Sequence, residues 1–286
     1  MIESHTSTKT ILVTGATGNI GRELLARLAG RDDVRVRAAT RDPASATFPP
    51  GIEAVATDLR DAESLRAALD GVTTLFLVSR VGDDARILAA AQAAGVEHVV
   101  LVSSITVQTH PHLGPAMENA AVERLLVDSG MAWTILRPTQ FASNALWWAP
   151  AIRESGGVEI PFADIGLPTI HPGDIAAVAA LAATEPDHRG RTYALTGPQP
   201  ITARRQVEVI AAALGQPLSV TEIGRAQARA RLLPALDPDT ADALLDVTGG
   251  DVTDDLRTVH DTVARITGRQ PRPFHEWVTH HLTEFR

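Results

Sequence analysis

Three glycines, at positions 15, 18 and 21, form the segment of this sequence with the clearest chemical use. The segment 14–21 reads TGATGNIG and follows an apolar run, TILVT, that predicts a buried strand. Gly15 permits a tight turn, Gly18 lets the backbone approach a pyrophosphate, and Gly21 lets the next helix pack closely on the strand. The N-terminus of that helix offers amides and a partial positive charge to phosphates. The pattern predicts a dinucleotide site; a purely structural glycine turn is the alternative.

The end of the second predicted strand bears on the choice between NAD and NADP. An acid about 20 residues after the turn usually accepts a hydrogen bond from the ribose 2′-hydroxyl of NAD. Here the strand ends in Thr40-Arg41, and a guanidinium can hold a 2′-phosphate, so NADP(H) is favoured over NAD(H). The alternatives are a solvated Arg41 and an Asp42 turned toward the ribose. Asp58, after the third strand, is expected at the adenine or as the N-cap of the next helix.

Two rare residue types limit the possible chemistry. Lys9 is the only lysine, Tyr193 is the only tyrosine, and the sequence has no cysteine. Schiff-base chemistry, a catalytic Tyr-plus-Lys pair and thiolate chemistry are therefore disfavoured. The pair Ser103-Ser104 has no Gly-x-Ser-x-Gly context, which disfavours a serine hydrolase.

Two histidines are the candidate proton donors. His110 and His112 follow the fifth predicted strand, and either could donate a proton near neutral pH. Exposed loop histidines without a role are the alternative. No third ligand lies near them in the sequence, so no metal site is predicted.

Aromatic residues gather after Pro138 and could form the walls of a substrate pocket. They are Phe141, Trp147, Trp148 and Phe162. His171 is expected at the edge of this pocket. Packing anchors are the alternative for each ring.

The elements that must position these residues alternate between strand and helix. Apolar runs predict strands at 10–14, 34–38, 52–57, 74–78, 99–102, 133–136 and 192–195, with helices at 19–28, 62–69, 84–94, 117–129 and 175–183. Short links between apolar strands indicate an α/β Rossmann fold, a doubly wound parallel sheet with a smaller C-terminal substrate lobe. Residues 9–140, with 168–196 returning to them, form the expected NAD(P)-binding core. Residues 141–286 are expected to be mainly the substrate-side segment and a helical cap, with helices at 203–213 and 255–266.

Composition excludes several classes of protein. The 286 residues hold 26 Lys+Arg and 34 Asp+Glu, and a net charge of −8 argues against nucleic-acid binding. No apolar run reaches the roughly 18 residues of a membrane helix, and the N-terminal residues lack a signal-peptide core. We therefore expect a cytoplasmic protein without membrane or nucleic-acid partners. The aromatics after Pro138 favour a small aromatic substrate, and a monomer or homodimer is expected.

A series of motifs resembles the NmrA-like group of atypical short-chain dehydrogenase/reductases. In chain order they are TGATGNIG, Arg41, Ser103-Ser104, the stretch from Glu123 through WTILRP at 133–138 to Asn144, and PGDIA at 172–176. The resemblance covers roughly residues 10–222 and implies a Rossmann domain with bound NAD(P). It implies cofactor contacts by Gly15, Thr17, Gly18, Asn19, Ile20, Arg41, Asp58, Ser79, Ser103 and Thr139. It also implies that Asn144 and the aromatics near it face the substrate.

The sequence departs from the wider superfamily at its catalytic pair. The alignment places Pro115 and Asn119 where typical members have the tyrosine and lysine of a Tyr-x-x-x-Lys motif, and neither can replace them. Reduction of a ketone gives an alkoxide of pKa near 15.7, which needs a proton donor. Reduction of a quinone gives an aryloxide of pKa about 10, which solvent can protonate. The expected function is therefore an NAD(P)H-dependent reductase of a quinone or polycyclic aromatic substrate.

Two other functions remain open from the sequence. One is a non-catalytic, NADP(H)-binding redox sensor that signals to a partner. The other is a tailoring enzyme that oxygenates or couples an aromatic natural product, such as an aromatic polyketide, with a bound dinucleotide.

Overall fold

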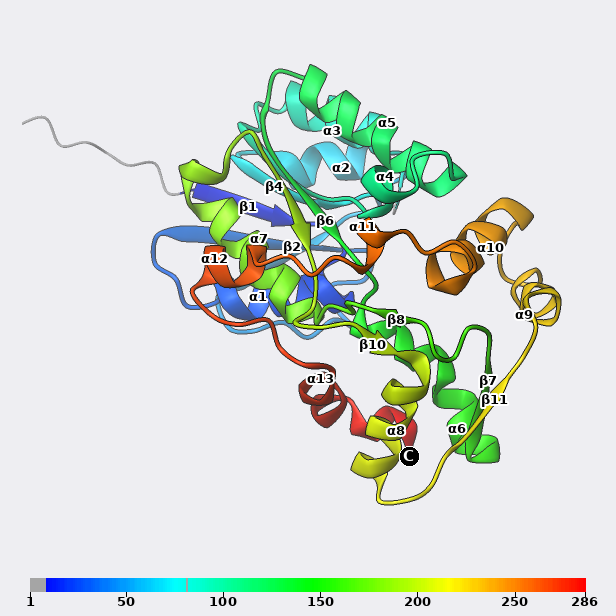
Figure 1. The fold of residues 1–286 in the computed structure, drawn as a ribbon. Coiled ribbons are helices and arrows are strands. Elements are labelled where there is room, and N and C mark those ends of the chain that lie inside the picture. The colour runs from blue at the N-terminus through cyan, green and yellow to red at the C-terminus, as the bar shows by residue number, and fades with distance from the viewer. Residues whose placement is uncertain (1–8, 81) are drawn as a thin grey trace, which may run out of the picture. The chain divides into compact units, whose positions relative to one another are not determined.

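The apolar runs of the sequence form one seven-stranded sheet in the computed structural model, which describes residues 9–80 and 82–286 (Figure 1). Its strands are β1 (Lys9–Val13), β2 (Val34–Thr40), β3 (Ile52–Ala56), β4 (Thr74–Val78), β5 (His98–Val102), β6 (Ala132–Pro138) and β9 (Arg191–Leu195). They lie in the order β3-β2-β1-β4-β5-β6-β9, and the pairings among β1 to β6 are parallel. The order reverses between β1 and β4, where sheets of this kind bind ligands.

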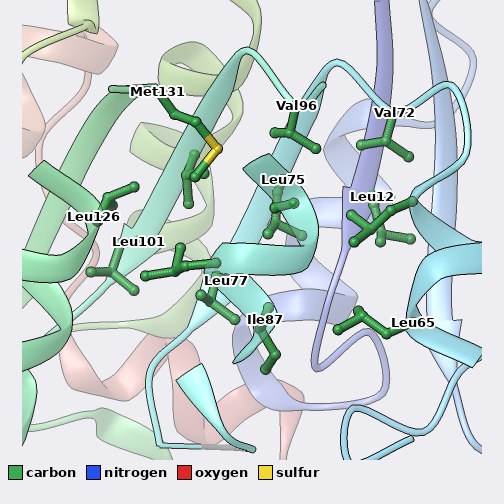
Figure 2. Packing of buried hydrophobic residues seen from close by; sticks show 14 of the residues in the cluster. Leu12, Leu65, Val72, Leu75, Leu77, Ile87, Val96, Leu101, Leu126 and Met131 are labelled. Carbon is green, nitrogen blue, oxygen red and sulfur yellow. The ribbon is translucent and has the colours of Figure 1, made fainter. Parts of the chain in front are cut away.

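Helices cover both faces of this sheet. They are α1 (Asn19–Leu28), α2 (Ala62–Leu69), α3 (Asp84–Ala93), α5 (Gly114–Asp128) and α7 (Pro172–Thr184). Figure 2 shows Leu65 of α2 and Ile87 of α3 in the same buried cluster as Leu12, Leu75 and Leu77 of the strands. Figure 1 shows α1 and α7 on the opposite face. The predicted Rossmann fold is confirmed.

The chain divides into two compact units. The first holds the chain through Ser103, with Ala121–Leu136 and Ile175–Tyr193. The second holds Ser104–Ala120, Arg137–Asp174 and Ala194–Arg286.

The second unit contains short elements around its own core. Two small sheets pair β8 (Gly166–Leu167) with β10 (Ile201–Thr202) and β7 (Gly157–Ile160) with β11 (Ser219–Glu222). Its helices are α4 (Thr106–Thr109), the 3-10 helix Ala142–Trp148, α6 (Ala149–Ser155), α8 (Ala203–Leu214), α9 (Arg225–Leu232), α10 (Pro238–Leu245), the π-helix Asp246–Gly250, α11 (Asp254–Arg257), α12 (Thr262–Thr267), α13 (Phe274–His280) and the 3-10 helix Leu282–Phe285. Its core includes the fully buried Trp277, which stacks on His281 with ring centroids 4.5 Å apart.

The helix predicted at 255–266 is wrong. The chain forms two short helices, α11 and α12, with an extended Thr258 after the first. The break follows from a bond between distant segments. The His260 amide donates to the Thr196 hydroxyl over 2.9 Å, and that hydroxyl lies 3.3 Å from the His260 carbonyl, so His260 is held outside a helix.

None of the helices within residues 9–80 and 82–286 is long and apolar enough to cross a membrane.

Candidate functional site

The turn after β1 has the conformation that a phosphate-binding loop needs. Gly15 has a left-handed backbone, with φ of +61°, which side chains rarely allow. The Gly18 amide donates to the Gly15 carbonyl over 2.9 Å and closes the turn. A Cβ atom at Gly21 would overlap that same carbonyl oxygen, so glycine permits the close approach of α1. The amide and hydroxyl of Thr14 both donate to the Phe76 carbonyl of β4 over 3.0 Å, which fixes the turn to the sheet.

The N-terminus of α1 is open to an anion. Gly18 is its N-cap, and among the described residues no side chain accepts a hydrogen bond from the first amides. The first turn also holds no acidic residue, so the positive end of the helix dipole is not neutralised. A dinucleotide diphosphate fits this cradle, which the amides of Asn19 and Ile20 help to form.

A hollow of about 990 Å³ adjoins the turn at the carboxyl ends of β1, β2 and β3; we call it the nucleotide hollow. Its polar lining includes Thr17, Arg22, Thr40, Arg41, Asp42, Ser45, Thr47, Thr57, Asp58 and Arg60. The Nε of Arg22 donates to the Thr17 carbonyl over 2.7 Å, which ties α1 back to the glycine turn.

Arg41 is one of three exposed arginines that line this hollow, with Arg22 and Arg60. It makes no hydrogen bond or ion pair with any other described residue, so its guanidinium is available to a ligand. Asp42, in contrast, accepts from the amides of Ala44 and Ser45 over 3.1 and 3.2 Å. Hydrogen bonding from Ser45 holds the pKa of Asp42 below its ordinary value, so this carboxylate is already used within its own loop.

Asp58 and Arg37 both have local structural partners. The Asp58 carboxylate accepts from the Arg60 amide over 3.0 Å, and the N-cap of α2 is Asp61 instead. Arg37, on β2, contacts Glu53 over 3.1 Å and the Asp70 carbonyl over 2.5 Å, and it does not line the hollow.

Six of the ten predicted cofactor residues do not line the nucleotide hollow. Gly18, Asn19 and Ile20 belong to the glycine turn and the start of α1, and the other three are Ser79, Ser103 and Thr139. The Ser79 amide, after β4, donates to the Val102 carbonyl over 3.0 Å. The hydroxyl of the buried Ser103 donates to Glu123 of α5 over 2.6 Å. Thr139 belongs to the second unit, where its hydroxyl is buried and meets no hydrogen-bond partner among the described residues. Their cofactor roles remain predictions.

The three histidine candidates occupy different environments within the second unit. His110 is fully buried; its Nδ1 lies 2.8 Å from the Thr109 hydroxyl and its Nε2 lies 2.7 Å from the Asp251 carbonyl. Both nitrogens are therefore used within the protein, which leaves none for a substrate in this arrangement. His112 is exposed. His171 is buried and accepts from the Gly173 amide at Nδ1 over 2.9 Å.

The lysine, the tyrosine and the asparagine considered for a Tyr-plus-Lys pair each have a hydrogen-bond partner within the protein. Lys9 donates to the Thr184 carbonyl over 2.6 Å, and the Tyr193 hydroxyl lies 2.9 Å from Nδ1 of His188. Asn119 donates to the Pro115 carbonyl over 2.9 Å within α5.

A second hollow, of about 340 Å³, lies within the second unit; we call it the aromatic pocket. Four predicted aromatics line it together with the predicted amide: Phe141, Trp147, Trp148, Phe162 and Asn144. Trp147 is 64% exposed, and Trp148 is partly buried against the core of this unit. His171 does not line this pocket.

The backbone at one wall of the aromatic pocket is strained. Phe162 has a φ of +53°, which is unusual for a residue with a bulky side chain. Gly249, in the π-helix Asp246–Gly250, lies so close that a Cβ atom there would overlap the Cβ and ring of Phe162. Strained residues and π-helical turns are frequent at functional sites.

Several residues of the aromatic pocket were not predicted from the sequence. Gln140, Glu159, Gln206 and Arg231 supply polar atoms, and Leu232 and Leu245 supply apolar walls. No local pattern marks them, because they come from separate elements that meet only in the folded unit. Gln206, on α8, gives one sequence signal: it is a polar residue on the buried face of an amphipathic helix.

A doubly wound sheet with a glycine turn and an open helix N-terminus defines a dinucleotide-binding protein. Comparison with known proteins agrees, since residues 15–186 match the model of a family described as NAD(P)H-binding. A (4-alkanoyl-5-oxo-2,5-dihydrofuran-3-yl)methyl phosphate reductase of Streptomyces griseus is 40% identical over 96% of this chain and 99% of its own length. An NAD(P)H azoreductase of Xenophilus azovorans is 36% identical over 96% of this chain and 99% of its own.

A solved structure of a reductase is also similar to this chain. An NADPH-dependent quinone oxidoreductase of Escherichia coli superposes with a TM-score of 0.78 at 30% identity, covering 95% of this chain and 99% of the other. The chain belongs to the NAD(P)H-binding family, and it is an NAD(P)H-dependent oxidoreductase. The resemblance to the NmrA-like group is thereby confirmed.

Proposed function

We propose that the chain is an NADPH-dependent reductase of a quinone or a comparable conjugated aromatic acceptor. The observation that carries the proposal is the aromatic pocket, whose rings Phe141, Trp148 and Phe162 come from separate segments of the second unit. Flat conjugated molecules bind well between such rings.

The preference for NADPH is supported by the state of Arg41 and Asp42. A guanidinium without a protein partner matches a 2′-phosphate, to which it can donate paired hydrogen bonds. The acid that would bind the ribose of NAD is already engaged by the amides of Ala44 and Ser45.

The acceptor class is supported by the missing Tyr-x-x-x-Lys pair, because the reduction of a ketone needs such a proton donor and the reduction of a quinone does not. A bound nicotinamide would supply a hydride, which carries two electrons and one proton and so converts a quinone to the hydroquinone monoanion. One further proton completes the hydroquinone, and it can come from water, because the anion is an aryloxide with a pKa of about 10. Quinones, azo compounds and acyl-dihydrofuranones, the classes in the relatives' names, all accept a hydride into a conjugated π system. The protein's contribution is to bind and orient the acceptor.

Steady-state oxidation of NADPH and NADH with a panel of quinones tests this proposal. We expect turnover with NADPH, and Asn144→Ala should raise the KM for the quinone several-fold without changing the KM for NADPH. Gln216→Ala, an exposed amide of the same unit outside the pocket, is the matched control. Tight NADPH binding without oxidation by any acceptor would refute the reductase and favour the redox sensor.

Arg41→Ala tests the cofactor preference separately. It should weaken NADPH binding about tenfold and leave NADH binding unchanged. The tenfold change corresponds to about 1.4 kcal/mol, which is the loss expected for one charge-assisted contact. Arg60→Ala is a control that removes another arginine of the same hollow. An equal loss for both nucleotides would contradict the preference.

A further inference from the structure

The wall of the aromatic pocket carries one pair of opposite charges. Arg231 lies near the end of α9, and Glu159 lies on β7; their Nη2 and Oε2 atoms are 2.5 Å apart. No other charged residue of the described chain lines this pocket. The pair therefore provides its only fixed charges.

The elements position both side chains for this role. In β7, Val158 and Ile160 are buried and Glu159 between them is exposed, because successive side chains of a strand point to opposite faces. On α9, Ala228, Arg231 and Leu232 share a helix face, since residues three and four apart are neighbours, and all three line the pocket.

Arg231 differs from the other two arginines of α9. Arg229 donates to both carboxylate oxygens of Asp242 over 2.8 and 3.0 Å, and Arg225 contacts Asp246 over 2.6 Å. These contacts tie α9 to α10 and to the π-helix Asp246–Gly250 that follows it, and neither arginine lines the pocket. Within residues 9–80 and 82–286, Arg231 has only Glu159 as a polar partner, so most of its five N–H donors have none.

The pair of Arg231 with Glu159 is easily exchanged. The two side chains are 49% and 43% exposed, and ion pairs of that exposure are weak because water and salt screen them. An anion on a bound ligand can replace Glu159 with paired hydrogen bonds, which a guanidinium forms best with phosphate, sulfonate or carboxylate. A local cation matters here because the chain has a net charge of −8.

We infer that Arg231 selects acceptors that carry an anionic substituent, and that Glu159 holds the guanidinium when no such acceptor is bound. This inference rests on the proposed function, because it assigns the substrate class of the same pocket. Neutral acceptors bind beside an intact pair, whereas anionic acceptors gain the freed guanidinium. Removing each partner should thus have opposite effects on anionic acceptors.

The test compares a naphthoquinone with the same naphthoquinone carrying one sulfonate. Arg231→Gln should lower kcat/KM for the sulfonated acceptor about tenfold and leave the neutral acceptor within about twofold. Glu159→Gln should raise kcat/KM for the sulfonated acceptor several-fold. Arg229→Gln, an arginine of the same helix outside the pocket, should not change the ratio of the two acceptors. Thermal unfolding of each variant reports whether it is folded.

Binding provides a readout that does not need turnover. The sulfonated naphthoquinone should quench the fluorescence of Trp147 and Trp148, with a Kd that rises about tenfold in Arg231→Gln and falls in Glu159→Gln. If no variant oxidises NADPH but these shifts appear, the proposed reductase fails and the anion site stands. Equal changes for both acceptors, or none in either variant, would overturn the anion site while quinone turnover survives.

Discussion

Substitution of Gly21 by alanine tests the phosphate cradle most directly. A Cβ atom at this position would overlap the Gly15 carbonyl oxygen and lie 2.8 Å from the carbonyl carbon and 2.9 Å from the Cα of Ala16. All three are backbone atoms of the glycine turn, so no flexible side chain can move aside. The turn must shift away from α1, together with the Gly15 carbonyl that accepts from the Gly18 amide.

The size of the effect follows from overpacking. Adding a methyl group to a well-packed site costs about 1–3 kcal/mol, since backbone shifts only partly relieve the overlap. If binding requires the original turn, the same free energy opposes cofactor binding, and the Kd for NADPH should rise about tenfold or more. The free energy of unfolding without cofactor should fall by a comparable or smaller amount.

Calorimetric titration with NADPH and urea unfolding measure the two quantities. Gly114→Ala is the matched control, because a Cβ atom there meets no other atom within 4 Å and the position lies at the start of α5. The control should bind NADPH as the wild type does. If Gly21→Ala also binds with an unchanged Kd while remaining folded, this turn does not cradle the diphosphate.

Two further predictions concern stability and the pocket wall. Burial lowers the pKa of His98 to about 4, against 6.5 for an exposed histidine, so the unfolded chain binds more protons as the pH falls. This contribution to stability is present above pH 6.5 and is lost as the pH falls from 6.5 to 4, by about 2 kcal/mol at pH 5. Urea unfolding at pH 7 and pH 5 should therefore show that the free energy of unfolding falls less in His98→Gln than in the wild type. An identical fall in both proteins would contradict the assignment. Gly249→Ala would force a methyl group into the Phe162 ring. It should therefore raise the KM for the acceptor and lower the free energy of unfolding by about 1–3 kcal/mol. Gly224→Ala, in open space at the N-cap of α9, is the control and should change neither the KM for the acceptor nor the stability.

Much of the fold could be predicted because its signals are local. An apolar run long enough for a strand, followed by Gly15, Gly18 and Gly21, allows few backbone paths, and the alternation of strands and helices then leaves one sheet architecture. The prediction of one helix at 255–266 is wrong because a contact between distant segments overrides the local pattern. Its residues have helical spacing, but hydrogen bonds between His260 and the Thr196 hydroxyl hold His260 outside a helix.

The candidate site residues also differ in whether local sequence or distant contacts set their environment. His110 lies in a loop by its sequence position, yet it is fully buried because Asp251, 141 residues later, covers one of its nitrogens. The aromatic pocket was predicted as a local group of rings after Pro138 together with Asn144, and its other polar residues were not predicted.

The amino-acid sequence by itself determined the nucleotide-binding half of this protein, because a glycine turn and a helix N-terminus are made by consecutive residues. Tertiary structure alone decided which charges line the aromatic pocket. Glu159 and Arg231 are 72 positions apart, and their 2.5 Å contact exists only because a short strand and a helix end meet at one wall of the folded second unit.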